Sequence, residues 1–239
     1  MGWPNHDNEN KEWDEFDYEK FMRECDARTD KYAELMDKYR GHPDRERLIA
    51  QEMGWAWLEE ALDAQEQGTG ESGGSRQNSK DFQPTAEAFD PPKNVPDLGP
   101  DPATEGVDWV RKEDGYVCHP LSFRALEGSI RLWDKFEELG LDNSEDEDLC
   151  GLLGEYQTTS AKLAGALDGL AYGRRLSEGA FIVACLKRAL SHLHTAQAAL
   201  ENVTKKGLLP AELLASTRGE FFALREEILR LMTEFRGQR

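Results

Sequence analysis

Apolar side chains recur at steps of three and four residues through most of the second half of the chain, which is the spacing of one helix face. Four helices are predicted there, and their first residues are Pro120, Ser144, Ser177 and Pro210. Long helices joined by short connections favour antiparallel neighbours. The pattern therefore predicts an all-α protein whose C-terminal region is an antiparallel up-and-down four-helix bundle.

Local signals refine this bundle, which we place in residues 107–239. The residues of its first helix that we expect to face the core are Phe123, Leu126, Ile130, Trp133 and either Phe136 or Glu137. Ser144-Glu145-Asp146-Glu147 matches a capping box, with Ser144 as the N-cap of the second helix. An Asp114-Gly115 turn between two short apolar runs predicts a small β-hairpin ahead of the bundle.

Two further helices are predicted in residues 1–67. The first covers residues 12–40 and ends before Pro43, and the second covers residues 44–67. Their short connection makes them an antiparallel helical hairpin. The next stretch, residues 68–106, holds six of the ten prolines and few apolar side chains. We therefore expect a disordered Pro/Gly-rich linker between the hairpin and the bundle.

The charge of the chain narrows the classes of partner. The formal net charge is −18 at pH 7, which opposes binding to nucleic acid and to anionic lipid. Residues 1–66 contribute 19 Asp/Glu and 9 Lys/Arg, whereas residues 107–239 contribute 21 and 17. A neutral or basic protein is therefore the expected partner of the acidic N-terminal hairpin.

Neither a membrane nor an oxidising compartment is indicated. The first residues are polar and acidic up to Trp13, without a secretion signal. No run approaches the roughly 18 apolar residues that a membrane helix needs. The four cysteines are far apart and form no C-x-x-C pair. We therefore expect a cytoplasmic protein with no bound metal or cofactor.

Aromatic side chains are concentrated in the acidic hairpin, which holds four of the six tryptophans. Two helices cannot bury so much aromatic surface within themselves. These side chains therefore either pack on the bundle or on a second copy, or bind a partner, for which Trp and Tyr are frequent anchors. The candidate partner-binding residues are Trp13, Phe16, Tyr18, Phe21, Trp55 and Trp57.

Small residues recur at every fourth position of the second bundle helix, at Ala161, Gly165, Gly169 and Gly173. An interior glycine costs a helix roughly 1 kcal/mol relative to alanine, so the row needs a compensating contact. It predicts the close approach of another helix, inside the bundle or from a second copy of the chain. A cleft for a small ligand is the alternative.

One spacing in the third bundle helix points to chemistry. Arg188 and His194 form an R-x5-H pair, which resembles the motif of HEPN-type RNases, a family of helical bundles. The resemblance implies that Arg188 and His194 act at the scissile phosphate of an RNA. His192 and His194 point to different sides of their helix, so they do not chelate one metal ion together.

These features favour a non-catalytic protein-protein interaction or scaffold protein. The acidic hairpin would bind a partner, while the bundle would form the body or a dimer contact. A HEPN-like RNase and a helix bundle that senses a small ligand are the alternatives.

Overall fold

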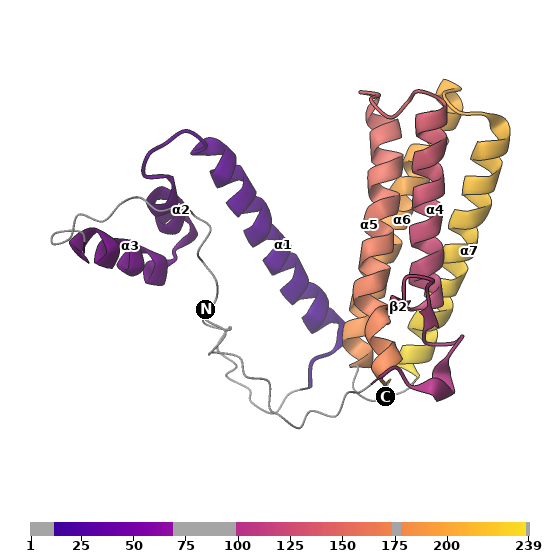
Figure 1. Cartoon of the computed structure of the whole chain (residues 1–239), viewed down its shortest axis with the longest axis horizontal. Helices are drawn as coiled ribbons and strands as arrows, with labels where there is room; N and C mark the ends of the chain where they lie inside the picture. Colours follow the sequence, from indigo (N-terminus) through magenta and orange to yellow (C-terminus); the bar gives the residue numbers. More distant parts are fainter. Residues whose placement is uncertain (1–11, 69–98, 174–177, 238–239) are drawn as a thin grey trace. The chain divides into compact units, whose positions relative to one another are not determined.

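The computed structural model describes residues 12–68, 99–173 and 178–237, and nearly all of the secondary structure in them is helical (Figure 1). The prediction of an all-α protein is confirmed. The chain divides into two units, one formed by residues 1–19 and 97–239 and the other by residues 20–96. None of the described helices combines the length and the apolar character needed to cross a membrane.

The body of the first unit is four helices, α4 (Pro120–Glu138), α5 (Glu147–Leu167), α6 (Gly179–Lys206) and α7 (Ala211–Arg236). α5 packs on α4 and on α6, and α7 packs on α6 and on α4, so the four helices enclose one core (Figure 1). The largest fully buried side chains belong to α5, α6 and α7 and include Leu152, Tyr156, Leu163, Leu186, Leu193, Leu200, Phe221 and Leu224.

The start of α5 differs by two residues from its prediction. The Asp146 carboxylate, and not the Ser144 hydroxyl, caps the helix by accepting hydrogen bonds from the backbone N–H groups of Asp148 and Leu149. Asp146 also pairs with Lys206 of α6 at 2.7 Å. Ser144 instead accepts a hydrogen bond from the Asp146 backbone N–H at 3.2 Å. The carboxylate is favoured as the cap because its charge suits both the helix N-terminus and the lysine.

The predicted β-hairpin is present and is attached to the end of the bundle. Its strands β1 (Val110–Arg111) and β2 (Val117–Cys118) pair antiparallel. Just before them, the Trp109 indole N–H donates to the Asp101 carbonyl at 2.7 Å, and the Asp101 N–H donates to the Ala171 carbonyl at 2.7 Å. The last part of the predicted linker is therefore ordered, including a short 3-10 helix, η3 (Pro102–Thr104). Residues 69–98 of that linker lie outside the described residues.

Three helices contribute to the second unit, α1 (Glu15–Lys38), α2 (Arg45–Met53) and α3 (Ala56–Gly68). The prediction of a single helix over residues 44–67 is wrong, because the helix ends at Gly54. Gly54 adopts a left-handed conformation with φ +69°, and the Trp55 N–H then returns to the Ala50 carbonyl at 2.8 Å. This is the hydrogen-bond pattern of a glycine-terminated helix end.

The face that α4 turns to the core is also not the predicted one. Its buried residues are Leu121, Ser122, Ala125, Gly128, Ser129, Leu132 and Phe136. Phe136 is therefore where it was expected, but Leu126, Ile130 and Trp133 are 37%, 45% and 37% exposed. The ring of Tyr156 reaches from α5 to Gly128, so the space beneath this part of α4 accepts only small side chains.

The row of small residues does not run along one α-helix. α5 ends at Leu167 and is followed by a 3-10 helix, η4 (Asp168–Tyr172). Gly165 and Gly169 are exposed, and a Cβ atom at either position would meet no atom within 4 Å. The described part of the bundle therefore shows no close helix crossing at these two glycines, and a contact with a second copy stays a prediction.

Gly128 of α4 is the glycine whose missing side chain the core requires. A Cβ atom there would overlap with the Tyr156 hydroxyl and the Glu220 carboxylate. Tyr156 is completely buried, and its ring meets that of Phe221 edge-on with 4.8 Å between centroids. Its hydroxyl makes no hydrogen bond of good geometry among the described residues, and burial, together with the nearby Glu220 carboxylate, raises the pKa of Tyr156.

We expect Gly128→Ala to lower the free energy of unfolding by about 1–3 kcal/mol, because the added methyl group overpacks the core. Gly154→Ala is the matched control, since Gly154 is exposed on α5 and has no atom within 4 Å of a Cβ. It should stabilise the protein by up to about 1 kcal/mol through helix propensity. Urea denaturation measures both variants.

Tyr156→Phe provides a second check, because it removes a buried hydroxyl that makes no hydrogen bond of good geometry. The single variant should be at least as stable as the wild type. In the double variant with Gly128→Ala, part of the lost stability should return. Equal stabilities of Gly128→Ala and Gly154→Ala would contradict this account of the core.

Candidate functional site

The acidic, aromatic start of α1 lies against the bundle within the first unit. The Asp14 carboxylate accepts hydrogen bonds from the N–H groups of Phe16 and Asp17 at 2.8 and 2.9 Å, and the Asp17 carboxylate accepts one from the Asp14 N–H at 3.2 Å. Reciprocal bonds of this kind form a capping box. They fix where α1 begins, and therefore which of its side chains reach α6 and α7.

Glu15 is the buried centre of this contact. Its two carboxylate oxygens accept hydrogen bonds from the Arg236 guanidinium at 2.9 and 3.0 Å, and Lys187 lies 2.9 Å from one of them. The hydrogen bond to Arg236, helped by Lys187 and opposed by burial, lowers the pKa of Glu15 from 4.5 to about 2. Glu15 is therefore ionised at neutral pH and joins α1 to both α6 and α7.

Aromatic side chains surround this ion pair. Tyr18 stacks edge-on against Trp13 at 5.1 Å and against Phe181 of α6 at 5.3 Å between ring centroids, and its hydroxyl bonds Glu178. The Lys187 ammonium lies 4.2 Å from the centroid of the Phe16 ring, which is otherwise 64% exposed. Trp13 and Tyr18 thus attach α1 to the bundle, while most of Phe16 is open to solvent.

A second aromatic group lies in the other unit. Trp55 is in contact with Tyr32 of α1 at 5.6 Å and with Trp57 of α3 at 6.5 Å between ring centroids. Trp57 is 54% exposed and Tyr32 is 38% exposed. We call Tyr32, Trp55 and Trp57 the aromatic row.

Polar bonds hold the helices that carry the aromatic row. Glu52 of α2 accepts hydrogen bonds from Lys38 and from the Tyr39 hydroxyl, each at 2.6 Å, and its carbonyl accepts one from Lys31. The bond to Glu52 raises the pKa of Lys38 to about 12. Lys31, Lys38 and Tyr39 thus fasten the α1 side of this unit to α2.

The six candidate partner-binding residues therefore fall into different places. Trp13 and Tyr18 are half-buried against the bundle, and Phe16 is exposed beside them. Trp55 and Trp57 belong to the aromatic row, and Phe21 is half-buried on α1 in the same unit. Sequence reasoning missed Tyr32 as a candidate, because its spacing from Leu35 and Tyr39 placed it on the expected inner face of the helix.

The R-x5-H pair lies on α6. Arg188 is half-buried and His194 is exposed, and six residues turn the two side chains by about 240° around the helix. His192 binds Glu155 of α5 through Nδ1 at 2.7 Å. No group of three or more His, Cys, Asp or Glu side chains that could hold a metal ion occurs within the described ranges.

A serine, a histidine and an aspartate do meet at the junction of the β-hairpin and the bundle. Asp168 accepts a hydrogen bond from the His119 backbone N–H at 2.9 Å and lies 2.6 Å from the Ser122 hydroxyl. The His119 ring uses Nδ1 to accept the Leu121 backbone N–H at 3.0 Å, which caps α4. A catalytic base would need this ring to receive the serine proton, so these bonds support a structural role in attaching the hairpin.

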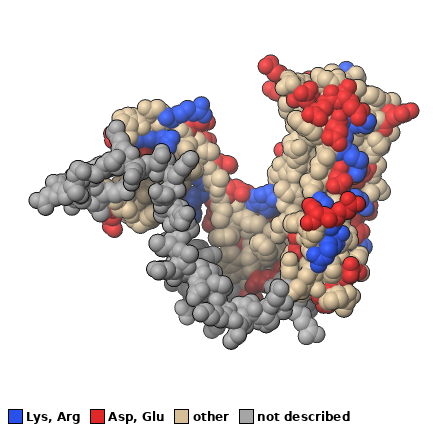
Figure 2. Space-filling view, in the orientation of Figure 1, with Lys and Arg blue, Asp and Glu red and all other residues tan. Residues whose placement is uncertain are grey.

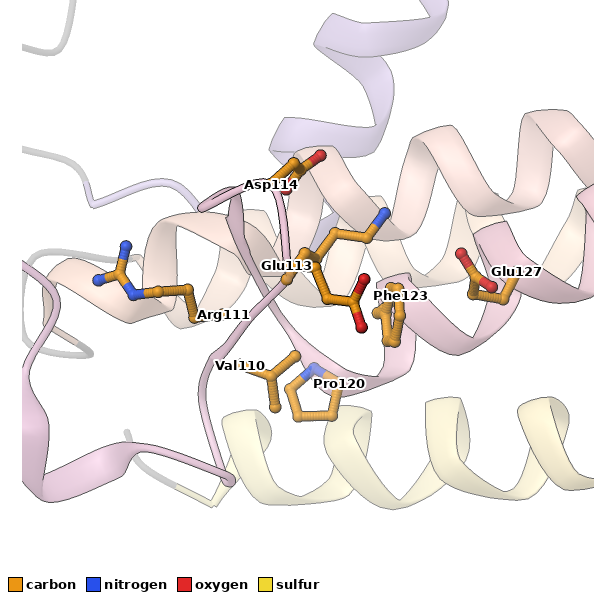
Figure 3. Close-up of a pocket in the computed structure, with 8 residues that line it drawn as sticks. Val110, Arg111, Glu113, Asp114, Pro120, Phe123 and Glu127 are labelled. Atoms are coloured by element: carbon orange, nitrogen blue, oxygen red, sulfur yellow. The ribbon is translucent and has the colours of Figure 1, made fainter.

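A shallow pocket of about 600 Å³ lies between the β-hairpin and the first turns of α4 (Figure 3). Its lining includes Val110, Arg111, Lys112, Glu113, Asp114, Pro120, Phe123 and Glu127. Lys112 lies 4.7 Å from the centroid of the Phe123 ring. Charges of both signs line the pocket, so it does not offer a single charge to a ligand.

We expect Glu15→Gln to lower the free energy of unfolding by about 1–3 kcal/mol at pH 7, because Arg236 and Lys187 then lose their buried counter-ion. The folded-state pKa of Glu15 is below the ordinary value of 4.5. Its contribution is therefore complete above pH 4.5 and is lost as the pH falls toward 2. Urea denaturation at several pH values should show the difference from the wild type shrinking over this range.

Glu12→Gln is the control, since Glu12 is an exposed carboxylate in the same segment. Its effect should stay within about 0.5 kcal/mol, the range of ordinary surface substitutions. If Glu15→Gln has an equally small and pH-independent effect, the contact of α1 with the bundle does not depend on this ion pair.

No protein-family model matches this chain, and neither a curated protein nor a solved structure is significantly similar to it. The functional argument therefore depends on the geometry of the described residues.

Proposed function

We propose that this chain is a non-catalytic protein-binding scaffold. Its partner is a neutral or basic protein that binds the aromatic row of α1–α3, and the four-helix bundle is the body that carries this binding surface. The observation that supports the proposal most directly is the exposure of Trp57 next to Trp55, in a unit whose described side chains bury very little apolar surface.

The shortage of buried side chains is the first argument. Among the described side chains of residues 20–63, those buried are Leu35, Ile49 and Ala50. Three residues are a small core for about forty, and small domains with little burial are only marginally stable alone. A partner that covers the aromatic row would supply the missing apolar contact, since large aromatic side chains dominate the energetics of interfaces.

Charge is the second argument. Residues 20–63, which carry the aromatic row, hold 11 Asp/Glu and 8 Lys/Arg, so they have a small excess of negative charge. On the visible face of the bundle, Lys and Arg lie among Asp and Glu along its length (Figure 2). Acidic side chains around an apolar contact increase the association rate with a basic partner and disfavour an acidic one.

The attachment of α1 is the third argument. Its first turn is held by Glu15, Trp13 and Tyr18 within the bundle unit, and its remainder belongs to the unit with the aromatic row. One continuous helix therefore connects the proposed binding surface to the body. A scaffold requires such a connection, whereas an enzyme would require convergent reactive groups.

Trp57→Ala tests the proposal in the full-length protein. We expect affinity purification from the native host, quantified by mass spectrometry, to recover a partner with the wild type. The amount recovered with Trp57→Ala should be lower by about tenfold or more, because truncation of an aromatic anchor weakens binding to that extent. The purified partner should then show the same loss in isothermal titration calorimetry.

Phe222→Ala is the matched control, because Phe222 of α7 is a similarly exposed aromatic residue, at 63%. It should leave recovery unchanged. Equal recovery of the same proteins by all three forms would contradict the proposal. RNA cleavage by the wild type that Arg188→Ala abolishes would replace it with the RNase alternative.

A further inference from the structure

A second apolar surface lies on the bundle, where α4 turns large side chains outward. Leu126, Ile130 and Trp133 follow one another at steps of four and three residues and are 37%, 45% and 37% exposed. Such steps place them in one line along the helix. Single exposed apolar residues are ordinary, but a continuous line of three with small neutral neighbours marks an interaction surface. We call these three residues the α4 stripe.

The neighbouring helix α5 carries few charged side chains. Between Asp148 and Asp168 its charged residues are Glu155 and Lys162, and Glu155 faces α6 through its contact with His192. The exposed residues of α5 include the uncharged Gly154, Gln157 and Ala161. Figure 2 shows the bundle surface along α5 largely without charge, next to the charged surface along α4.

Helical periodicity places these two surfaces together. Ser122 and Ser129 are on the side of α4 next to α5, as the contact of Ser122 with Asp168 shows, and the α4 stripe begins one step further around the helix on the solvent side. The α4 stripe therefore lies on the α5 side of its helix, and α5 carries few charged side chains.

Carboxylates border the α4 stripe on its other side. Glu127 and Asp134 lie beside the α4 stripe on the same helix, and Glu137 follows the stripe in line with it; none of the three forms an ion pair within the described part of the chain. The nearby basic residue Arg131 is already paired with Glu220 of α7 at 2.9 Å. The border of the α4 stripe is therefore acidic.

We propose that the α4 stripe binds an amphipathic helix of another protein, with an apolar face of leucine-like side chains bordered by Lys or Arg. An amphipathic helix laid on an apolar surface is a recurrent mode of recognition, and the unpaired carboxylates supply the complementary charge. A second copy of this chain fits less well, because each copy would bring the same carboxylates and a net charge of −18. The α4 stripe and the aromatic row consist of different residues in different units, so this proposal does not depend on the proposed function.

Two labelled model peptides test the proposal by fluorescence anisotropy with the full-length protein. Both peptides have the same apolar face; Lys borders it in one and Glu in the other. The Lys-bordered peptide should bind and weaken as salt is added, and the Glu-bordered peptide should bind at least tenfold more weakly. Equal binding of both peptides, or binding of neither, overturns the proposal.

Substitutions assign the binding to the α4 stripe. Ile130→Glu should lower the affinity for the Lys-bordered peptide by tenfold or more. Phe222→Glu, at another exposed apolar position, should leave that affinity unchanged. Glu127→Lys with Asp134→Lys should shift the preference toward the Glu-bordered peptide, and the double reversal Glu212→Lys with Glu226→Lys on α7 should leave it unchanged. Circular dichroism verifies that each variant is folded.

Two further results would decide against the proposal. Equal losses for Ile130→Glu and Phe222→Glu would show that the peptide binds elsewhere on the acidic surface. A dimer seen by light scattering, and dissociated by Ile130→Glu alone, would show that a second copy occupies the α4 stripe.

Discussion

The packing of α5 against α6 is the contact from which the rest of the bundle follows. Both helices present leucines to it, with Leu152 and Leu163 on one side and Leu186 and Leu193 on the other, all fully buried. The ring of Tyr156 fills the space between α5, α4 and α7. α4 then buries a small residue, Gly128, next to Tyr156, and Leu126, Ile130 and Trp133 remain partly exposed. The α4 stripe is thus a consequence of how the core is filled.

The ion pair of Glu15 shows how a polar contact can specify position more than it adds stability. Burying a carboxylate with Arg236 and Lys187 costs much of what their attraction returns. Glu19, one turn further along α1, lies 3.6 Å from the same Lys187, so two carboxylates of α1 share this lysine. Together with the capping box at Asp14, these ion pairs attach the first turns of α1 to α6 and α7.

The sequence predicts those parts of the fold that depend on neighbouring residues along the chain. The helices of the bundle and the β-hairpin turn at Gly115 depend on periodicity and turn residues, and the structure contains them. The prediction of which residues of α4 are buried is wrong, because the room beneath α4 depends on Tyr156 of α5. The sequence of α4 alone does not reveal this. Periodicity predicts that the helix continues through Gly54. The structure shows that it ends there, because Gly54 is left-handed and the Trp55 N–H returns to the Ala50 carbonyl.

The candidate site was predictable in composition but not in arrangement. The sequence shows aromatic residues beside acids near the N-terminus, yet it could not separate Tyr18, which contacts Phe181 of α6, from Trp57, which is exposed. That separation depends on Lys187 and Arg236, which are far away in the sequence. Long-range charge pairing leaves no local pattern that periodicity could detect.

The aromatic row and the α4 stripe share one physical feature, which is exposed apolar surface on a chain with a net charge of −18. Exposed apolar surface alone tends to associate with copies of itself, and a high net charge opposes that association. Under both proposals, the acidity of this chain would have two linked effects: it would oppose contact between copies of the chain, and it would favour a basic partner at each surface.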